Sequence, residues 1–246
     1  MRRVSLSLAA ALICSAGACF ASGSAPWGYV GSTGPDHWGS LSPAYEMCAR
    51  GVNQSPVNLT GFVEAELEPI DFHYTGLATE VVNNGHTIQA NYTVGSTIKA
   101  AGTVFELTQF HFHSPSENTI DGMYYPLEGH FVHVADDGAI AVISVMYKIG
   151  SENEALARLW RQMPQAAGEK EAMAAQVRAQ DLMPEDRDYY RFNGSLTTPP
   201  CTEGVLWLVM KEPVEVSTEQ VEQFVHAMHH ANNRPVQPIG ARAVLK

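Results

Sequence analysis

Seven short segments of this 246-residue chain alternate between apolar and polar side chains, and this period of two constrains the fold more than any other feature. Each segment is rich in β-branched and aromatic residues, and clusters of Gly, Pro, Asn and Asp separate one segment from the next. The segments are residues 70–74, 80–82, 87–92, 105–113, 130–134, 140–147 and 205–209. So many strands at turn-length spacing predict a mainly antiparallel sheet.

Only two segments have the period of a helix. Residues 152–162 follow Ser151, and residues 218–229 follow Ser217, with Gln220 three residues later to complete a capping box. Two late helices are too few for a doubly wound α/β fold. No repeat, low-complexity tract or charged linker interrupts residues 26–246, so we expect a single domain there.

The first residues have the pattern of a secretory signal peptide. Two basic residues precede an apolar run over residues 4–18, which is too short to cross a bilayer comfortably, and small residues follow. We expect a signal peptide over residues 1–21, with cleavage between 18 and 25 and export to the periplasm. Cys19 leaves a lipoprotein anchor as an alternative, although Ala16 stands where a larger aliphatic residue is usual.

The charge of the chain excludes some classes of partner. The full chain has a formal charge of -11, and loss of Arg2 and Arg3 with the signal leaves 13 basic against 26 acidic residues, or -13. Such a surface repels phosphate backbones and anionic lipid, which argues against nucleic acid and membrane partners. Cys48 and Cys201 then remain, and in an oxidising compartment they predict one disulfide, with two free thiols as the alternative.

Two of the predicted strands carry histidines at a spacing that suits a metal ion. Alternation within residues 109–113 places His111 and His113 on one face, with Cα atoms roughly 6.5 Å apart. Residues 128–133 repeat this logic and offer His130 as a third imidazole. Three neutral imidazoles on a rigid sheet suit Zn²⁺ and leave one tetrahedral position open for water, as in a catalytic site.

Metal-bound histidines usually donate the second ring N–H to an oxygen. Gln109 and Glu128 lie two residues before His111 and His130 on the same strand faces, so we expect them to be these acceptors. For His113 no side-chain partner is evident, and a backbone carbonyl would suffice. Without such partners, histidines on a strand more often form a plain polar face.

The cupin barrel is a competing interpretation, because His111, His113 and Glu117 also match its His-x-His-x(3)-Glu motif. Cupins expect a Gly six residues before the first His, where this chain has Phe105. Their second element, Pro-x-Gly-x-x-His, has the wrong spacing in residues 126–130. We therefore set the cupin barrel aside.

Taken together, these motifs make the chain resemble the α-class carbonic anhydrases, specifically the exported bacterial members. The matching segments are residues 27–29, 34–38, 54–58, 83–86, 109–113, 128–130, 195–201 and 233–238. The resemblance implies a large twisted, mostly antiparallel sheet of about ten strands with peripheral helices, and a zinc ion in a conical cleft. It also implies reversible hydration of CO2 to bicarbonate and a proton by zinc-bound hydroxide, the reaction for which this family is the reference case.

The resemblance assigns roles to further residues. Thr197 would accept a hydrogen bond from the hydroxide and donate one to ionised Glu117, and Thr198 would contact bicarbonate. His86 would relay the proton to solvent through waters ordered by Tyr29 and Asn84. The apolar wall of the CO2 pocket would comprise Val132, Ile140, Val142, Leu196 and Trp207. The family pattern also suggests cis peptide bonds at Ser55-Pro56 and Pro199-Pro200.

Two departures from the pattern concern the network around the site: Phe192 stands where many members have Tyr, and Asn118 replaces a His. The remaining histidines have simpler explanations: His226, His229 and His230 near a helix C-terminus would complement its dipole, and His133 would be packed on the far side of its strand. A homodimer is plausible from bacterial relatives. The alternative function is a non-catalytic exported zinc-binding or carbonic-anhydrase-like interaction protein.

Overall fold

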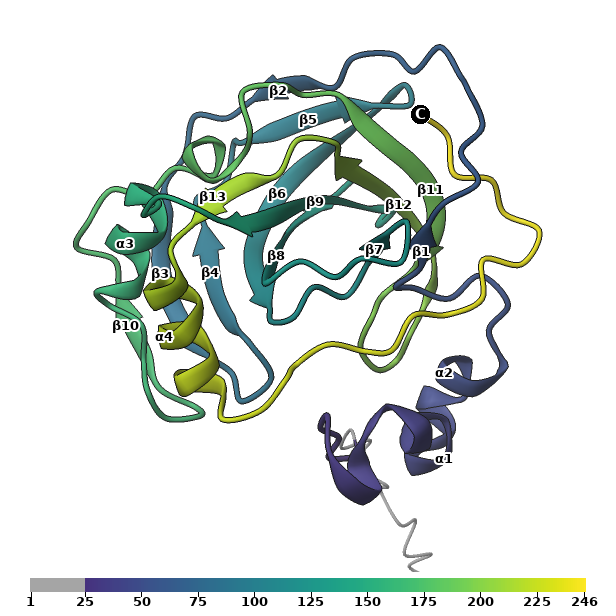
Figure 1. Ribbon diagram of the computed structural model, residues 1–246, viewed down its shortest axis with the longest axis horizontal. Coiled ribbons are helices and arrows are strands. Elements are labelled where there is room, and N and C mark those ends of the chain that lie inside the picture. Colours follow the sequence, from purple (N-terminus) through teal and green to yellow (C-terminus); the bar gives the residue numbers. More distant parts are fainter. Residues whose placement is uncertain (1–24) are drawn as a thin grey trace, which may run out of the picture.

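The computed structural model describes residues 25–246, so the predicted signal peptide lies outside the described residues. The chain forms one large sheet of 11 strands and a two-stranded sheet of β1 and β7 (Figure 1). The strands are β1 (Asn58–Leu59), β2 (Asp71–His73), β3 (Ala78–Asn83), β4 (Ile88–Tyr92), β5 (Thr97–Ala100), β6 (Thr103–His113), β7 (Thr119–Ile120), β8 (Leu127–Val134), β9 (Ile140–Ile149), β10 (Lys170–Ala172), β11 (Tyr189–Ser195), β12 (Glu203–Met210) and β13 (Val214–Val216). The predicted mainly β, single-domain fold is confirmed.

The strand order of the large sheet brings the histidine-bearing strands together. The order is β10-β3-β4-β6-β8-β9-β12-β11, with β5 also paired to β6, β2 to β5 and β13 to β9. The pairings of β9 with β12 and β13 are parallel, and the other pairings within this sheet are antiparallel. The strands β6 and β8 are therefore central neighbours, which positions the site described below.

In the described part of the chain four α-helices accompany the sheet: α1 (Trp38–Leu41), α2 (Met47–Arg50), α3 (Glu154–Trp160) and α4 (Thr218–Met228). The capping box that Ser217 and Gln220 form at α4 is present as predicted. The helix predicted over residues 152–162 is shorter at both ends. Asn153, and not Ser151, is its N-cap, because the Asn153 side chain accepts from the Leu156 N–H while the Ser151 N–H donates to Glu215. At the other end Pro164 disfavours helical backbone at the residue before it.

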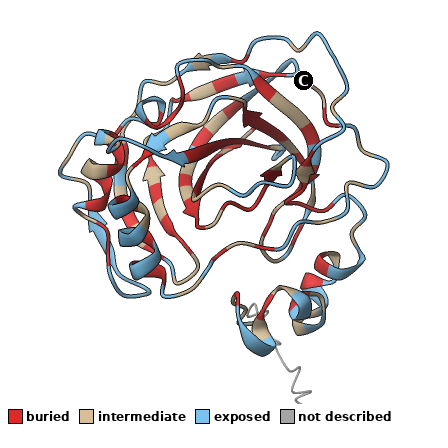
Figure 2. Ribbon diagram, in the orientation of Figure 1, coloured by how far each residue is buried: buried red, intermediate tan, exposed pale blue. Residues whose placement is uncertain are grey.

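Each face of the sheet carries an apolar cluster. On one face Phe110, Phe112 and Phe131 pack with Trp160 of α3 and Phe224 of α4 in the main core. On the other face Val142, Trp207 and neighbouring residues form a second cluster. The central strands are accordingly buried along most of their length (Figure 2). Within residues 25–246, no helix has the length and apolar character needed to cross a membrane.

A β-bulge in β6 sets which side chains face the site. Leu107 pairs with His133 and Gln109 pairs with Val132, so Thr108 is an extra residue on β6. Leu107 and Phe110 consequently both point into the main core, although their numbers differ by three. Beyond the bulge the alternation places Gln109 on the opposite face.

Candidate metal centre

Three histidines on the second face of the sheet form a cluster that could hold a metal ion. His111 and His130 are direct partners in the β6–β8 ladder, and His113 lies two residues along β6. One ligand nitrogen from each lies within 4.8 Å of the other two. The ring centroids are 4.6 to 5.3 Å apart. Because neighbouring strands hold all three rings, the cluster is rigid before any ion binds.

The outer nitrogen of each ring has an oxygen partner. Nδ1 of His111 lies 2.8 Å from Oε1 of Gln109, and Nδ1 of His113 lies 2.7 Å from the backbone oxygen of Asn232. Nε2 of His130 lies 2.8 Å from Oε1 of Glu128. These oxygens can only accept, so each ring donates there, and in the neutral form of each ring the other nitrogen has a free lone pair. The free nitrogens are thus Nε2 of His111 and His113 and Nδ1 of His130.

Buried polar atoms without partners surround the cluster. Among residues 25–246, Nε2 of His113, Oε2 of Glu117 and the hydroxyl of Tyr29 are buried and make no hydrogen bond. A buried polar atom without a partner is costly, so these atoms indicate a place for an ion and its water ligands. The residues present therefore fit a three-histidine metal site.

The electrostatics also favour a metal. Burial lowers the pKa of His111 well below its ordinary value, and His113 and His130 lower it further. Burial likewise lowers the pKa of His113, against a partly offsetting hydrogen bond to Asn232 and the charge of Glu128. Neutral imidazoles with free lone pairs are the form that binds a transition metal.

Glu117 lies directly beside the free nitrogens. Its Oε2 is 3.6 Å from Nε2 of His113 and 3.9 Å from Nδ1 of His130, and its Oε1 accepts the backbone N–H of Arg234 at 2.8 Å. Complete burial raises the pKa of Glu117 to about 7, although His130, Arg234 and Thr197 act to lower it.

Glu128 has the opposite character although it is equally buried. Burial raises its pKa, but the charge of His130 and hydrogen bonds from His130, Ser144 and Asn118 outweigh burial and lower the pKa to about 2. Its Oε2 also accepts the backbone N–H groups of both Glu117 and Asn118. Asn118, one of the two departures from the family pattern, thus donates directly to Glu128, the partner of His130.

The loop that carries Thr197 and Thr198 is tied to the predicted disulfide. Cys48 and Cys201 are bonded, with Cα atoms 5.0 Å apart. The backbone N–H of Cys201 donates to the carbonyl of Thr198 at 2.8 Å. Both predicted cis peptide bonds are present, and Ser114-Pro115 is cis as well.

The five residues assigned to the CO2 wall lie together. Val142 and Trp207 are buried in the second cluster, and Val132, Ile140 and Leu196 pack against it. Val142 pairs across the sheet with both Val132 and Trp207. The Trp207 ring lies edge-on to His130 with centroids 4.9 Å apart, so this apolar wall adjoins the three-histidine cluster. Phe192, the other departure, stacks on Trp207.

His86, at a partly exposed edge of the site, and the buried Tyr29 both contact Trp27. The His86 ring stacks on Trp27, with centroids 3.7 Å apart and planes 9° apart. Burial and then the charge of His230 lower the pKa of His86. Oδ1 of Asn84 accepts the backbone N–H groups of His86 and Thr87, so Asn84 shapes this turn.

Three residues near the site were not predicted to act there. The buried Asn232 holds the outer nitrogen of His113, and the buried Arg234 donates its backbone N–H to Glu117. The Arg234 guanidinium also binds Gln54 and the carbonyls of Ser55 and Cys48. His230 lies beside Tyr29, with ring centroids 5.9 Å apart. The motif 233–238 placed Arg234 in the family pattern, but nothing in it indicated these contacts.

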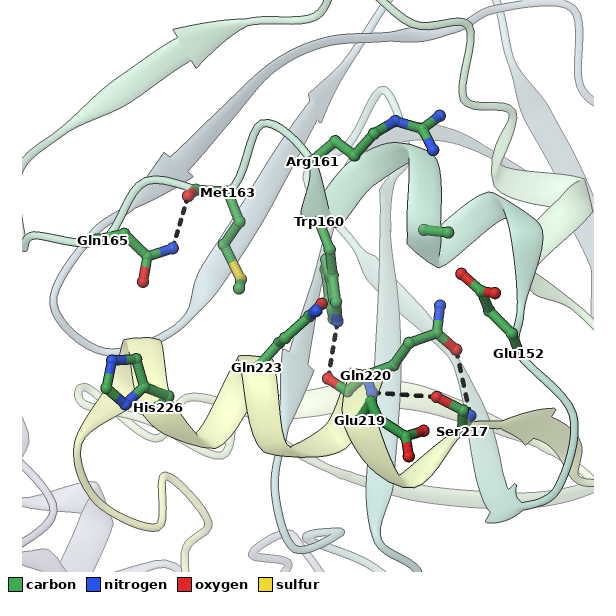
Figure 3. A pocket seen from close by; sticks show the side chains of 11 residues that line it. Glu152, Trp160, Arg161, Met163, Gln165, Ser217, Glu219, Gln220, Gln223 and His226 are labelled. Carbon is green, nitrogen blue, oxygen red and sulfur yellow. Dashed lines mark hydrogen bonds between the residues drawn. The ribbon is translucent and has the colours of Figure 1, made fainter.

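A separate cavity of about 570 Å³ lies between α3 and α4 (Figure 3). Trp160, Gln220 and His226 are among its lining residues, and no histidine of the cluster is. The Trp160 indole N–H donates to the backbone oxygen of Gln220, and Gln220 is bound to Ser217. These three polar groups satisfy one another, and His226 is the single histidine among the described residues that line this cavity.

Comparisons with known proteins agree on one family. The model of eukaryotic-type carbonic anhydrases matches residues 33–246. A carbonic anhydrase of Pectobacterium atrosepticum is 48% identical over 231 residues, which are 93% of this chain and 95% of that protein. The α-carbonic anhydrase of Thermovibrio ammonificans, solved with the inhibitor sulfanilamide, has a TM-score of 0.89 and 52% identity over 91% of this chain and 100% of that one. Dioscorin, solved with ascorbate, has a TM-score of 0.84 at 31% identity, covering 89% of this chain and 97% of that one.

Proposed function

This chain belongs to the eukaryotic-type carbonic anhydrase family, and on that premise we propose that it catalyses the zinc-dependent, reversible hydration of CO2 to bicarbonate and a proton. The observation that carries the proposal is the cluster of three imidazoles, each held by an oxygen at its outer nitrogen. Three histidine ligands and an open fourth position are typical of catalytic and not of structural zinc.

His111, His113 and His130 would hold the zinc ion. When bound, Zn²⁺ would act as a Lewis acid that makes water nucleophilic near neutral pH, the chemistry for which carbonic anhydrases are the reference case. A nearby dication also favours the charged form of a carboxylate, so metal binding would ionise Glu117. Gln109, Asn232 and Glu128 would keep the three rings in the orientation that binding requires.

Glu117 and Thr197 would orient the reacting water. Thr197 is buried and close enough to Glu117 to influence its pKa. An ionised Glu117 can only accept, so the Thr197 hydroxyl would donate its hydrogen bond to Glu117. The Thr197 hydroxyl oxygen would then be left as an acceptor for water. Thr198, which is partly exposed next to it, would contact bicarbonate.

The substrate would bind on the apolar wall. CO2 is small and uncharged, so it needs an apolar binding surface. The five residues that offer one here pack together in or against the second cluster: Val132, Ile140, Val142, Leu196 and Trp207. His86 would then carry the released proton toward solvent, with Tyr29 and Asn84 ordering the intervening waters. The lowered pKa of His86 keeps its ring neutral at pH 7 and able to accept that proton.

Residues 1–21 would direct export to the periplasm and residues 26–246 would form the mature domain, which a disulfide suits. The proposal includes a homodimer in which each subunit carries this site. The second candidate is a non-catalytic exported zinc-binding or carbonic-anhydrase-like interaction protein, because dioscorin has this fold and was solved with ascorbate, a ligand unrelated to CO2.

Zinc content and stopped-flow CO2 hydration would separate the two candidates. We expect the mature protein to hold about one zinc ion per chain, to hydrate CO2, and to lose the activity with a strong chelator. His111→Ala should abolish both properties, whereas His73→Ala, an exposed histidine on β2, should change neither. A zinc-loaded protein that does not hydrate CO2 would exclude the enzyme and favour the second candidate.

A further inference from the structure

His230 lies in a second position from which a proton could leave the site. It follows α4, and its ring faces Tyr29 with centroids 5.9 Å apart and planes 41° apart. Tyr29 in turn contacts Trp27 edge-on, and Trp27 stacks on His86. We call Trp27, Tyr29, His86 and His230 the rim cluster. It joins the N-terminal segment, the turn after β3 and the segment after α4.

One hydrogen bond ties together the two segments that carry the imidazoles of the rim cluster. Nδ2 of the buried Asn232 donates to the carbonyl of His86 at 3.0 Å, which fixes the segment after α4 against the turn that carries His86. His230 precedes Asn232 by two residues. After burial, its charge is the second cause that lowers the pKa of His86.

The hydrogen bond of His230 leaves it ready to accept a proton. Its Nδ1 lies 3.0 Å from the carbonyl of Ala231, and a carbonyl only accepts, so Nδ1 carries the hydrogen. Nε2 of the neutral ring then has a free lone pair. The side chain is partly exposed, so a proton taken up at Nε2 can pass on to a buffer base.

We propose that His230 is a second proton acceptor for CO2 hydration, sharing with His86 the proton that each turnover releases. The inference rests on the proposed function. In the balanced reaction CO2 and water give bicarbonate and a proton, and that proton forms a new N–H bond at Nε2 of His230 before a buffer base removes it. The other titratable groups in this part of the site are Tyr29 and, through its electrostatic interaction with Tyr29, Glu117.

The test is His230→Gln, with His226→Gln as the matched control. His226 is an exposed histidine on α4 that lines the cavity of Figure 3 and not the rim cluster. At low buffer concentration we expect His230→Gln to lower kcat by roughly threefold, less than the ~100-fold that a sole proton-transfer group can supply. The ratio kcat/KM should stay unchanged, and added imidazole should restore kcat. The control should match the wild type.

A second readout does not depend on activity. An NMR titration of the His86 ring should show a higher pKa in His230→Gln than in the wild type, because the neighbouring positive charge is gone. An unchanged kcat at low buffer, or an unchanged His86 pKa, would overturn the role of His230 while leaving the proposed function intact. A wild-type protein that holds zinc without hydrating CO2 would overturn both.

Discussion

Asn232 is the residue whose replacement tests most directly how the fold supports the metal centre. It is fully buried, and its side chain makes three hydrogen bonds. Oδ1 accepts the Ser114 N–H at 2.9 Å, and Nδ2 donates to the carbonyls of Phe112 and His86 at 2.9 and 3.0 Å. These bonds hold the backbone whose carbonyl accepts from His113. Asn232→Ala removes all three at once.

The size of the effect follows from what each partner loses. The buried Ser114 N–H is left without an acceptor, which costs about 1 to 3 kcal/mol. The Phe112 carbonyl keeps its hydrogen bond from the Thr87 hydroxyl, and the His86 carbonyl lies at a partly exposed residue, so each loses only about 1 kcal/mol. We expect the free energy of unfolding to fall by about 3 to 5 kcal/mol. Zinc affinity should fall by about 10- to 100-fold, because the acceptor of His113 is no longer held.

Urea unfolding of the metal-free protein measures the first quantity, and a zinc competition titration measures the second. Asn233→Ala is the matched control, since the Asn233 side chain makes only a 3.4 Å contact with the carbonyl of Ser116. The reasoning would be refuted if the two variants were equally stable, or if Asn232→Ala bound zinc as tightly as the wild type.

Three further predictions concern other parts of the molecule. Replacing Cys48 and Cys201 with Ala should lower the free energy of unfolding by ~5 kcal/mol in the chain-entropy model for a separation of 153 residues, measured by denaturant unfolding; an unchanged midpoint would contradict it. Val142→Phe should fill the space beside the apolar wall and lower kcat/KM at normal zinc content, whereas unchanged hydration kinetics would exclude CO2 from that wall. Burial lowers the pKa of His133 to about 3, so the unfolded chain binds the extra proton between that value and the ordinary pKa near 6.5. The free energy of unfolding should therefore decrease as the pH is lowered through that interval, by up to ~1.4 kcal/mol per pH unit. His133→Phe should show a smaller decrease than the wild type. Equal slopes of the free energy of unfolding against pH, measured by urea unfolding, would refute this.

The parts of the site that lie on one strand could be predicted from the sequence. Gln109, His111 and His113 occupy one face because alternation along a strand is a local property. The same holds for Glu128 and His130. Asn232 and Arg234 could not be found in this way, because each reaches the site from more than 110 residues away along the chain. Such contacts depend on how the chain returns to the sheet, which periodicity does not encode.

For the fold, the sequence predicts the type of sheet but not the arrangement of its strands. Seven alternating segments indicate a mainly antiparallel sheet, but they do not give the order of its strands or the two parallel pairings of β9. The N-terminus of α3 depends on whether Ser151 or Asn153 caps it. Asn153 is the cap, and the Ser151 N–H instead donates to Glu215 on β13, far away in the sequence. His230 was assigned to a helix terminus because its neighbours in the sequence are helical, whereas its neighbours in space belong to the rim cluster.

The bulge at Thr108 makes the metal centre depend on a count of backbone residues. His and Phe alternate from residue 110 to residue 113, so a shift by one position exchanges imidazoles for phenyl rings on each side of the sheet. Deletion of Thr108 would remove the bulge and leave a regular ladder, in which Leu107 and Phe110 still share the core face and the histidines keep theirs. A residue inserted into the first half of β6 has no such outlet and needs a second bulge, so insertions there threaten the site although that half of the strand contains none of its residues.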